Sequence, residues 1–349
     1  MITNPGRDPR WVSRPAPPEV LAFHRALPGY SPTPLVPLMN GVLVKDESSR
    51  LGLPAFKALG ASWAVHRALP DVTGGPATIV TATDGNHGRA VAHFARRFGR
   101  RAEIFVPDGV HPDAVRAIRD EGATVVHVPG DYDTAVKAAA SVRRGLLVQD
   151  TAWPGYEEIP GWIVDGYSTL FAEIDTQLSR QPDLVLVPAG VGSLLQAALA
   201  HYRSRPDPAR TRVVSVEPST AACVAASVAA GHPVTVPTAR TTMAGLNCGT
   251  VSTLAWPLIR PGLDGCCVVT DAEVSEAAHR LAAAGIDAGP CGAAPLAALP
   301  AIPTTGTVVL LATEGTAANP AGPATSRATA PPLRASPSAR SHGQHRTHD

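Results

Sequence analysis

The amino-acid sequence predicts an α/β protein built on two parallel sheets. A first series of β-branched runs alternates with stretches of helical pattern and lies at residues 78–83, 103–107, 124–128 and 146–150. A second series of apolar runs lies at residues 183–187, 212–218, 266–271 and 307–313. Strand-length apolar runs separated by about 10 to 15 residues of helical pattern are typical of parallel sheets covered by helices.

The break between the two series predicts two domains and a tail. We expect a smaller α/β domain at residues 77–160, inserted into a larger domain made of residues 1–76 and 161–316. From residue 317 to residue 349 the composition changes to Ala, Pro, Ser, Thr, Arg and His. Because so few bulky apolar side chains cannot offset the entropy of ordering the chain, we expect residues 317–349 to be disordered.

Composition and charge restrict the function classes. The 349 residues are 44% hydrophobic, and a formal charge of +1 with 17% charged residues offers no basic surface for nucleic acid. No apolar run approaches the ~20 residues that span a bilayer. The five cysteines form no CxxC pair, which favours a reducing cytoplasm over a disulfide framework. We therefore expect a cytoplasmic protein whose partner is a small molecule.

Lys57 is the first candidate for chemistry. It stands at the expected entry of a helix, just after Gly52 and Pro54, and only three of the thirty basic residues of the chain are lysines. Apolar neighbours such as Phe56 would lower the pKa of its ammonium group and free the amine to form an imine. An ordinary exposed helix lysine explains the pattern equally well.

A glycine-bearing turn, PAGVGSLL, follows the apolar run at 183–187 and opens a helix. Gly190 and Gly192 allow the backbone to close around an anion, and the amides of Gly192, Ser193 and Leu194 would point at it. The alternative is a tight strand-to-helix turn that binds nothing. Because a short G-x-G motif is weak evidence, this alternative is slightly favoured when the motif is taken alone. An ATPase or an NAD enzyme loses support, because neither a P-loop nor a six-residue G-x-G-x-x-G motif is present.

A second glycine-bearing turn, TATDGNHG, ends the run at 78–83. Asp84, Asn86 and His87 offer acid/base and hydrogen-bonding groups at a helix start, where a carboxylate could bind. Helix capping by Asp84 is the competing explanation.

Further along, the segment QDTAWPGYEEIPGW gathers Asp150 with aromatic and acidic side chains in a chain that is 5% aromatic. Such a loop lines a pocket or plugs a domain interface.

In this order the segments resemble the fold type II family of pyridoxal 5'-phosphate enzymes, which includes serine and threonine dehydratases, cysteine synthase and the tryptophan synthase β chain. The motifs YSPTPL, KDESSRLGLPAFKALG, TATDGNHGRAVA, VQDTAWPGYEEIPGW and TTMAGLNCG are most similar to the diaminopropionate ammonia-lyase branch. The resemblance covers residues 30–316. It implies two α/β domains with pyridoxal 5'-phosphate between them, a small amino-acid substrate and a homodimer.

The resemblance also implies how the cofactor is held. Lys57 matches the lysine that forms the Schiff base. Asn86 matches the asparagine that contacts the phenolic oxygen of the cofactor, and Thr313, in LLATEG, would face the pyridine nitrogen. The phosphate cup corresponds to the turn formed by Gly190, Val191, Gly192, Ser193 and Leu194.

The remaining matches concern the substrate. Asp84 stands where dehydratases with the motif SGNHG have a serine, and it is an acid/base candidate together with Asp150, a further pocket aspartate. The turn with Gly85 and His87 would bind the substrate carboxylate. The implied reaction is α,β-elimination of ammonia from 2,3-diaminopropionate, which gives pyruvate and ammonia.

Other functions stay open at this point. A serine or threonine dehydratase, or a β-replacement enzyme, would use the same cofactor with a different leaving group. A non-catalytic relative that acts as a binding or scaffold protein is suggested by AGPCGAAP, where Pro290 and Cys291 replace the glutamate and serine of the family pattern. An unrelated phosphate-binding α/β protein would explain the glycine turn but not Lys57. We predict no metal site.

Overall fold

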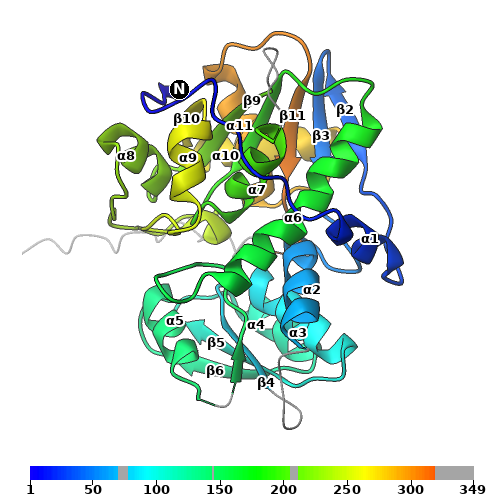
Figure 1. The fold of residues 1–349 in the computed structure, drawn as a ribbon, viewed down its shortest axis with the longest axis vertical. Helices are drawn as coiled ribbons and strands as arrows, with labels where there is room; N and C mark the ends of the chain where they lie inside the picture. The colour runs from blue at the N-terminus through cyan, green and yellow to red at the C-terminus, as the bar shows by residue number, and fades with distance from the viewer. Residues whose placement is uncertain (70–77, 144, 205–210, 319–349) are drawn as a thin grey trace, which may run out of the picture.

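A computed structural model describes residues 1–69, 78–143, 145–204 and 211–318 (Figure 1). Its described part holds a seven-stranded sheet and a four-stranded sheet, with α2 and α6 between them in the view of Figure 1. Within the described residues, no helix is long and apolar enough to cross a membrane. The predicted α/β class with two sheets is confirmed.

The larger sheet has a parallel centre and two antiparallel edge strands, β1 and β2. Its order within the described residues is β1 (Ile2–Thr3), β10 (Gly265–Val269), β9 (Arg212–Pro218), β8 (Leu184–Pro188), β11 (Val308–Ala312), β3 (Val42–Asp46) and β2 (Leu35–Met39). All five residues of β8 are buried, as expected for a strand covered on both faces. β1, β2 and β3 were not predicted from the sequence.

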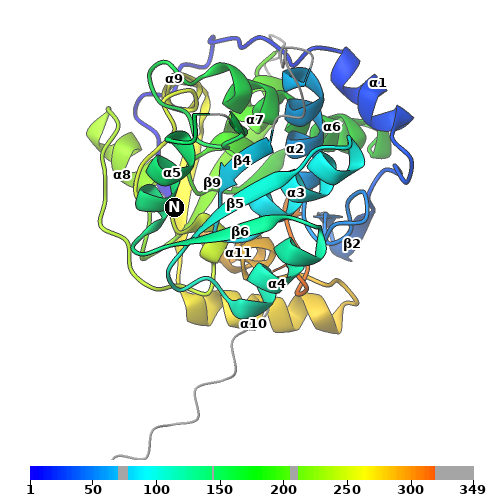
Figure 2. The ribbon, with the colours of Figure 1, turned by 90° about the horizontal axis from the view of Figure 1, so that it is seen from below.

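The smaller sheet is parallel throughout, and Figure 2 shows β4, β5 and β6 side by side in it. Its order is β6 (Thr124–Val128), β5 (Ala102–Pro107), β4 (Thr78–Ala82) and β7 (Gly145–Leu147). β7 ends earlier than the predicted run, so Asp150 lies in the loop that follows the strand. The four strands fall inside the predicted domain at 77–160, whose boundaries stay a prediction.

Helices cover both sheets. In chain order they are α1 (Glu19–Ala26), α2 (Lys57–Ala68), α3 (Asn86–Arg97), α4 (Pro112–Asp120), α5 (Tyr132–Ala140), α6 (Glu158–Gln177), α7 (Ser193–Tyr202), α8 (Cys223–Ala230), α9 (Trp256–Gly262), α10 (Asp271–Ala283) and α11 (Pro290–Ala298). Short 3-10 turns lie at Ala244–Leu246 and Leu299–Ala301.

The predicted tail, residues 317–349, stays a prediction, although its first two residues are among those the structure describes. The turn that follows β11 continues to Ala318, which is buried and donates its amide to the carbonyl of Gly315. The remainder of the predicted tail, residues 319–349, lies outside the described residues.

α2 and α6 cross at two glycines. A Cβ on Gly60 would lie 2.5 Å from the Tyr167 ring, and a Cβ on Gly166 would lie 2.6 Å from the carbonyl oxygen of Leu59. No larger side chain fits either position without a shift of one helix. This close crossing sets the first residue of α2, Lys57, beside Tyr167.

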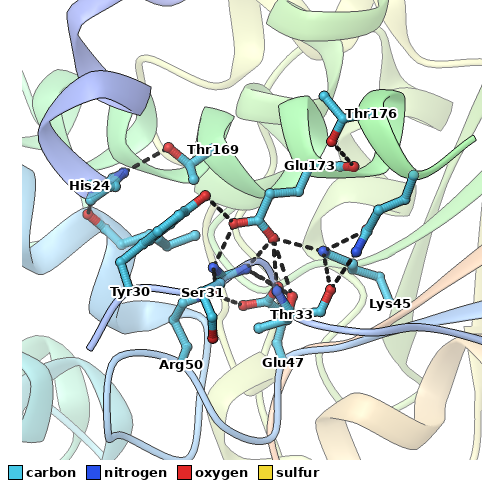
Figure 3. A network of polar contacts seen from close by, with 12 residues as sticks. His24, Tyr30, Ser31, Thr33, Lys45, Glu47, Arg50, Thr169, Glu173 and Thr176 are labelled. Atoms are coloured by element: carbon cyan, nitrogen blue, oxygen red, sulfur yellow. Dashed lines mark hydrogen bonds and ion pairs between the residues drawn. The ribbon is translucent and has the colours of Figure 1, made fainter. Parts of the chain in front are cut away.

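A buried ionic network fastens β3 and the loop after it to α6 (Figure 3). Glu173 of α6 binds Lys45 at 2.7 Å and Arg50 at 2.7 Å, and Arg50 also binds Glu47 at 2.6 Å. The four side chains are at most 3% exposed. Because a buried charge without a partner is costly, each ion in the network requires the others. The network therefore fixes the loop that leads to Lys57.

His24 connects α1 to α2 and α6. Its Nδ1 lies 2.7 Å from Thr169 Oγ1, and its Nε2 lies 3.0 Å from the carbonyl oxygen of Leu59 and 3.1 Å from Ser62 Oγ. Burial lowers the pKa of His24 to about 4. The folded chain therefore holds this imidazole neutral at pH values where the unfolded chain protonates it.

We predict that the contribution of His24 to the free energy of unfolding decreases by roughly 3 kcal/mol as the pH falls from about 6.5 to about 4, because in this range the unfolded chain binds one more proton at His24. The pH dependence of His24→Gln, which cannot titrate at this position, should differ from that of wild type by this amount. Urea unfolding at several pH values measures it, with the exposed His279→Gln as control. An equal decrease in His24→Gln and wild type would contradict the assignment.

Candidate active site

Lys57, at the start of α2, forms an ion pair with the acidic loop after β7. Its Nζ lies 2.6 Å from Asp150 Oδ2, and the two side chains are 20% and 8% exposed. The ammonium group also lies 5.4 Å from the centre of the Phe56 ring and 5.9 Å from that of Tyr167. The lysine is thus half enclosed by aromatic rings and directed at a carboxylate.

The expected lowering of the Lys57 pKa is wrong for this arrangement. Burial lowers the pKa of Lys57, as predicted, but the charge of Asp150 outweighs burial and raises the pKa above its ordinary value. Burial likewise would raise the pKa of Asp150, yet His87 and Lys57 hold it below its ordinary value. The sequence could not reveal this, because the two partners lie 93 residues apart.

Two residues that sequence reasoning missed hold the other oxygen of Asp150. Tyr132 donates its hydroxyl to Oδ1 at 3.3 Å, and Gln149 donates Nε2 to the same oxygen at 3.2 Å and to the Tyr132 hydroxyl at 2.7 Å. Gln149 stands next to Asp150 in the sequence, which was a usable signal. Tyr132, at the start of α5, gave none.

The aromatic part of the acidic loop supports the end of β7. The Tyr156 hydroxyl accepts from the Gln149 amide at 2.9 Å and donates to the Leu147 carbonyl at 2.9 Å, and its ring stacks on Trp153 at 4.5 Å between centres. The loop therefore presents Asp150 to the pocket while its rings pack on one another.

The turn after β4 brings Asp84 and His87 near the ion pair of Lys57 and Asp150. Thr83 Oγ1 caps this turn by accepting from the amides of Gly85 at 2.9 Å and Gly88 at 3.0 Å. The His87 ring is buried, with Nε2 2.8 Å from the Val148 carbonyl oxygen and Nδ1 3.8 Å from Asp150 Oδ2. The imidazole is thus turned toward β7, so the backbone of Gly85 and His87 is the candidate for holding a substrate carboxylate.

Asp84 differs from Asp150 in its ionisation. Burial and the neighbouring charge of Asp150 raise the pKa of Asp84 to about 6. Asp84 can therefore exchange a proton near neutral pH, whereas Asp150 stays ionised beside Lys57.

On the large-sheet side, the end of β11 faces Asn86. Asn86 Nδ2 donates to Glu314 Oε2 at 2.5 Å. Thr313 is buried, and its carbonyl accepts the Phe56 amide at 3.1 Å. Its predicted contact with a pyridine nitrogen stays a prediction. Glu314 was not singled out from the sequence, although it follows Thr313 directly.

The glycine turn lies between β8 and α7. A Cβ on Gly190 would lie 2.9 Å from Cys248 Sγ, and Gly192 has a φ of 97°, so both positions favour glycine. Ser193 donates its hydroxyl to the Asp150 carbonyl at 2.8 Å, and the Val191 carbonyl accepts the Ser252 amide at 2.8 Å. Leu194 is buried beneath the turn. The first amides of α7 lack partners inside the helix, and amides at a helix start can bind an anion.

These residues fit a cofactor that carries a reactive carbonyl and a phosphate. All of them follow the carboxyl ends of parallel strands, where ligands bind in open α/β sheets. Lys57 supplies an amine for the carbonyl, and the glycine turn at the start of α7 supplies amides for the phosphate. A Cβ at Gly190 or Gly192 would be crowded by neighbouring atoms. The fold and site define an α/β enzyme that uses a lysine-bound, phosphate-bearing cofactor.

Comparison with known proteins identifies the cofactor. Residues 26–314 match the family model described as pyridoxal-phosphate dependent enzyme. The chain belongs to this family and has its fold type II architecture. Diaminopropionate ammonia-lyase from Salmonella typhimurium is 36% identical over 305 residues, which cover 76% of this chain and 75% of that protein. A biosynthetic L-threonine dehydratase from Mycobacterium leprae is 30% identical over 68% of this chain and 56% of its own length.

Solved structures agree. The structure of diaminopropionate ammonia-lyase from Escherichia coli in complex with an aminoacrylate-PLP azomethine reaction intermediate is similar, with a TM-score of 0.82 and 31% sequence identity. The match covers 90% of this chain and 93% of that chain. Maize serine racemase, at 21% identity and a TM-score of 0.74, shares the fold.

We predict that Asp150→Asn lowers the pKa of Lys57 by more than about one unit, because burial then acts without the carboxylate that contacts Nζ. The pH dependence of amine acetylation in the cofactor-free protein, followed by mass spectrometry, measures this. The exposed Lys137 serves as the internal control. An unchanged Lys57 titration would show that Asp150 does not set its pKa.

Proposed function

We propose that the protein eliminates ammonia from 2,3-diaminopropionate to give pyruvate and ammonia. The observation that carries this proposal is the ion pair of Lys57 with Asp150, together with a second carboxylate, Asp84, whose raised pKa depends on the charges of both. The relatives named diaminopropionate ammonia-lyase support the choice of substrate. We also propose that the protein is a cytoplasmic homodimer, as the family resemblance implies, with residues 77–160 as its smaller domain.

Each residue of the site has a task in this reaction. When bound, pyridoxal 5'-phosphate supplies a conjugated ring that spreads the negative charge left at the substrate α-carbon. The amides from Gly190 to Leu194 hold its phosphate, and Asn86 and Thr313 contact its ring. The turn from Gly85 to His87 orients the substrate carboxylate.

Proton transfer falls to the charged residues. Lys57 Nζ, once it carries no proton, removes the α-proton on its own face of the substrate. The pKa of Asp84 is raised to about 6 by burial and by Asp150, so this residue takes or returns a proton on the other face of the substrate. It also supplies the proton that leaves with the β-nitrogen. Asp150 stays ionised and holds the amine of Lys57 in place.

We predict that the purified protein with added cofactor absorbs near about 410 to 420 nm and that Lys57→Ala removes this band. Borohydride reduction followed by peptide mapping should place the cofactor on Lys57 rather than on Lys45 or Lys137. Pyruvate formed from diaminopropionate and not from serine supports the lyase. The reverse result favours a dehydratase, and a band without any turnover favours an inactive relative.

We predict that Asp84→Asn lowers kcat by roughly 10²- to 10⁴-fold for one enantiomer of diaminopropionate and less for the other, because Lys57 alone serves one face. Since Asp84 must be ionised to act as a base, the wild-type rate for the sensitive enantiomer should rise as the pH passes about 6. Pyruvate assays with each enantiomer measure both effects. Equal losses for the two enantiomers would contradict the division of faces.

A further inference from the structure

Glu314 is a buried carboxylate that none of the proposed catalytic steps uses. Glu314 is 2% exposed and lies two residues after the end of β11. Oε2 accepts from Asn86 Nδ2 at 2.5 Å, and Oε1 accepts from the Cys291 amide at 3.2 Å. Asn86 begins α3 beside the small sheet, whereas Cys291 lies in the first turn of α11 beside the large sheet. Glu314 therefore joins the two halves of the site.

The start of α11 is shaped to receive this carboxylate. A Cβ on Gly289 would lie 3.1 Å from Glu314 Oε1, and a Cβ on Gly292 would lie 2.8 Å from its carbonyl oxygen, so a larger residue would crowd the side chain or the backbone. Pro290 occupies the first helical position, where no amide donor is required. The segment that departs from the family pattern thus forms a cradle for Glu314.

The hydrogen-bond pattern suits a carboxylate better than a carboxamide. Both oxygens of Glu314 accept, and a glutamine at this position would offer one oxygen and one NH2 group, so one N–H would face another donor. Burial raises the pKa of Glu314, but hydrogen bonds from Cys291 and Asn86 and the charge of Lys57 oppose this rise.

We propose that Glu314 is a positioning residue that fixes the side-chain amide of Asn86. An amide NH2 group carries two hydrogens, and because Glu314 takes one, the second is directed to an acceptor within the pocket. This inference rests on the proposed role of Asn86 as the contact to the phenolic oxygen of the cofactor. Without the carboxylate, the amide could rotate and present its own oxygen to that acceptor.

The experiment compares the holoenzyme with Glu314→Gln. We expect the cofactor dissociation constant to rise about tenfold and the pH midpoint of its visible absorbance to shift, because a charge-assisted contact to the cofactor-binding amide is lost. The matched control is Glu217→Gln. Glu217 is also buried at a strand end and accepts from two backbone amides, of Val224 at 2.7 Å and Ala225 at 2.8 Å. It should lose stability at most and keep the wild-type titration.

A double-mutant cycle tests whether Glu314 acts through Asn86. In an Asn86→Ala background, Glu314→Gln should change the absorbance titration and cofactor affinity little further. The same cycle decides the question if Glu314→Gln alone folds poorly. Wild-type absorbance and affinity in Glu314→Gln, or full additivity with Asn86→Ala, would overturn the proposal. Absence of the visible band in wild type would instead contradict the proposed function.

Discussion

The placement of the reactive lysine depends on the buried ion pairs that the carboxylate of Glu173 forms. Glu173 binds Arg50 in the loop that leads from β3 to Lys57, so the loop cannot move without separating buried charges. The same helix, α6, carries Gly166 and Tyr167. Both pack against the first turn of α2, which begins at Lys57. One helix therefore fixes both the loop before Lys57 and the helix after it.

The parts of the site that the sequence predicts are those formed by neighbouring residues. Asp84 and the turn of Gly190 and Gly192 each follow an apolar strand and open a helix, so strand, turn and helix start lie within one short segment. Because parallel strands end at the same edge of a sheet, such segments converge even when they are far apart in the chain. The alternation of apolar runs and helical stretches predicted the α/β class, and the order of the motifs carried the resemblance to the family.

The parts that the sequence did not predict depend on pairs of distant residues. Glu314 meets Asn86 across 228 positions, and Arg50 meets Glu173 across 123. β2, at the edge of the large sheet, and β3, its neighbour, have mixed burial patterns, and such patterns are weak signals beside the buried runs of the sheet centre. The prediction of a lowered pKa for Lys57 was wrong for the same reason. The apolar neighbours of Lys57 in the sequence suggest its burial, but they do not reveal its counter-charge, Asp150.

The charge pattern of the pocket explains why two aspartates there need not be redundant. Two carboxylates near each other cannot both ionise easily, and the one with the stronger cationic partner takes the charge. Asp150 has Lys57 at 2.6 Å and donors from Tyr132 and Gln149, so it stays ionised. Asp84 then faces an existing negative charge, which helps to raise its pKa to about 6. The contacts that hold the lysine therefore also adjust the second carboxylate to exchange protons.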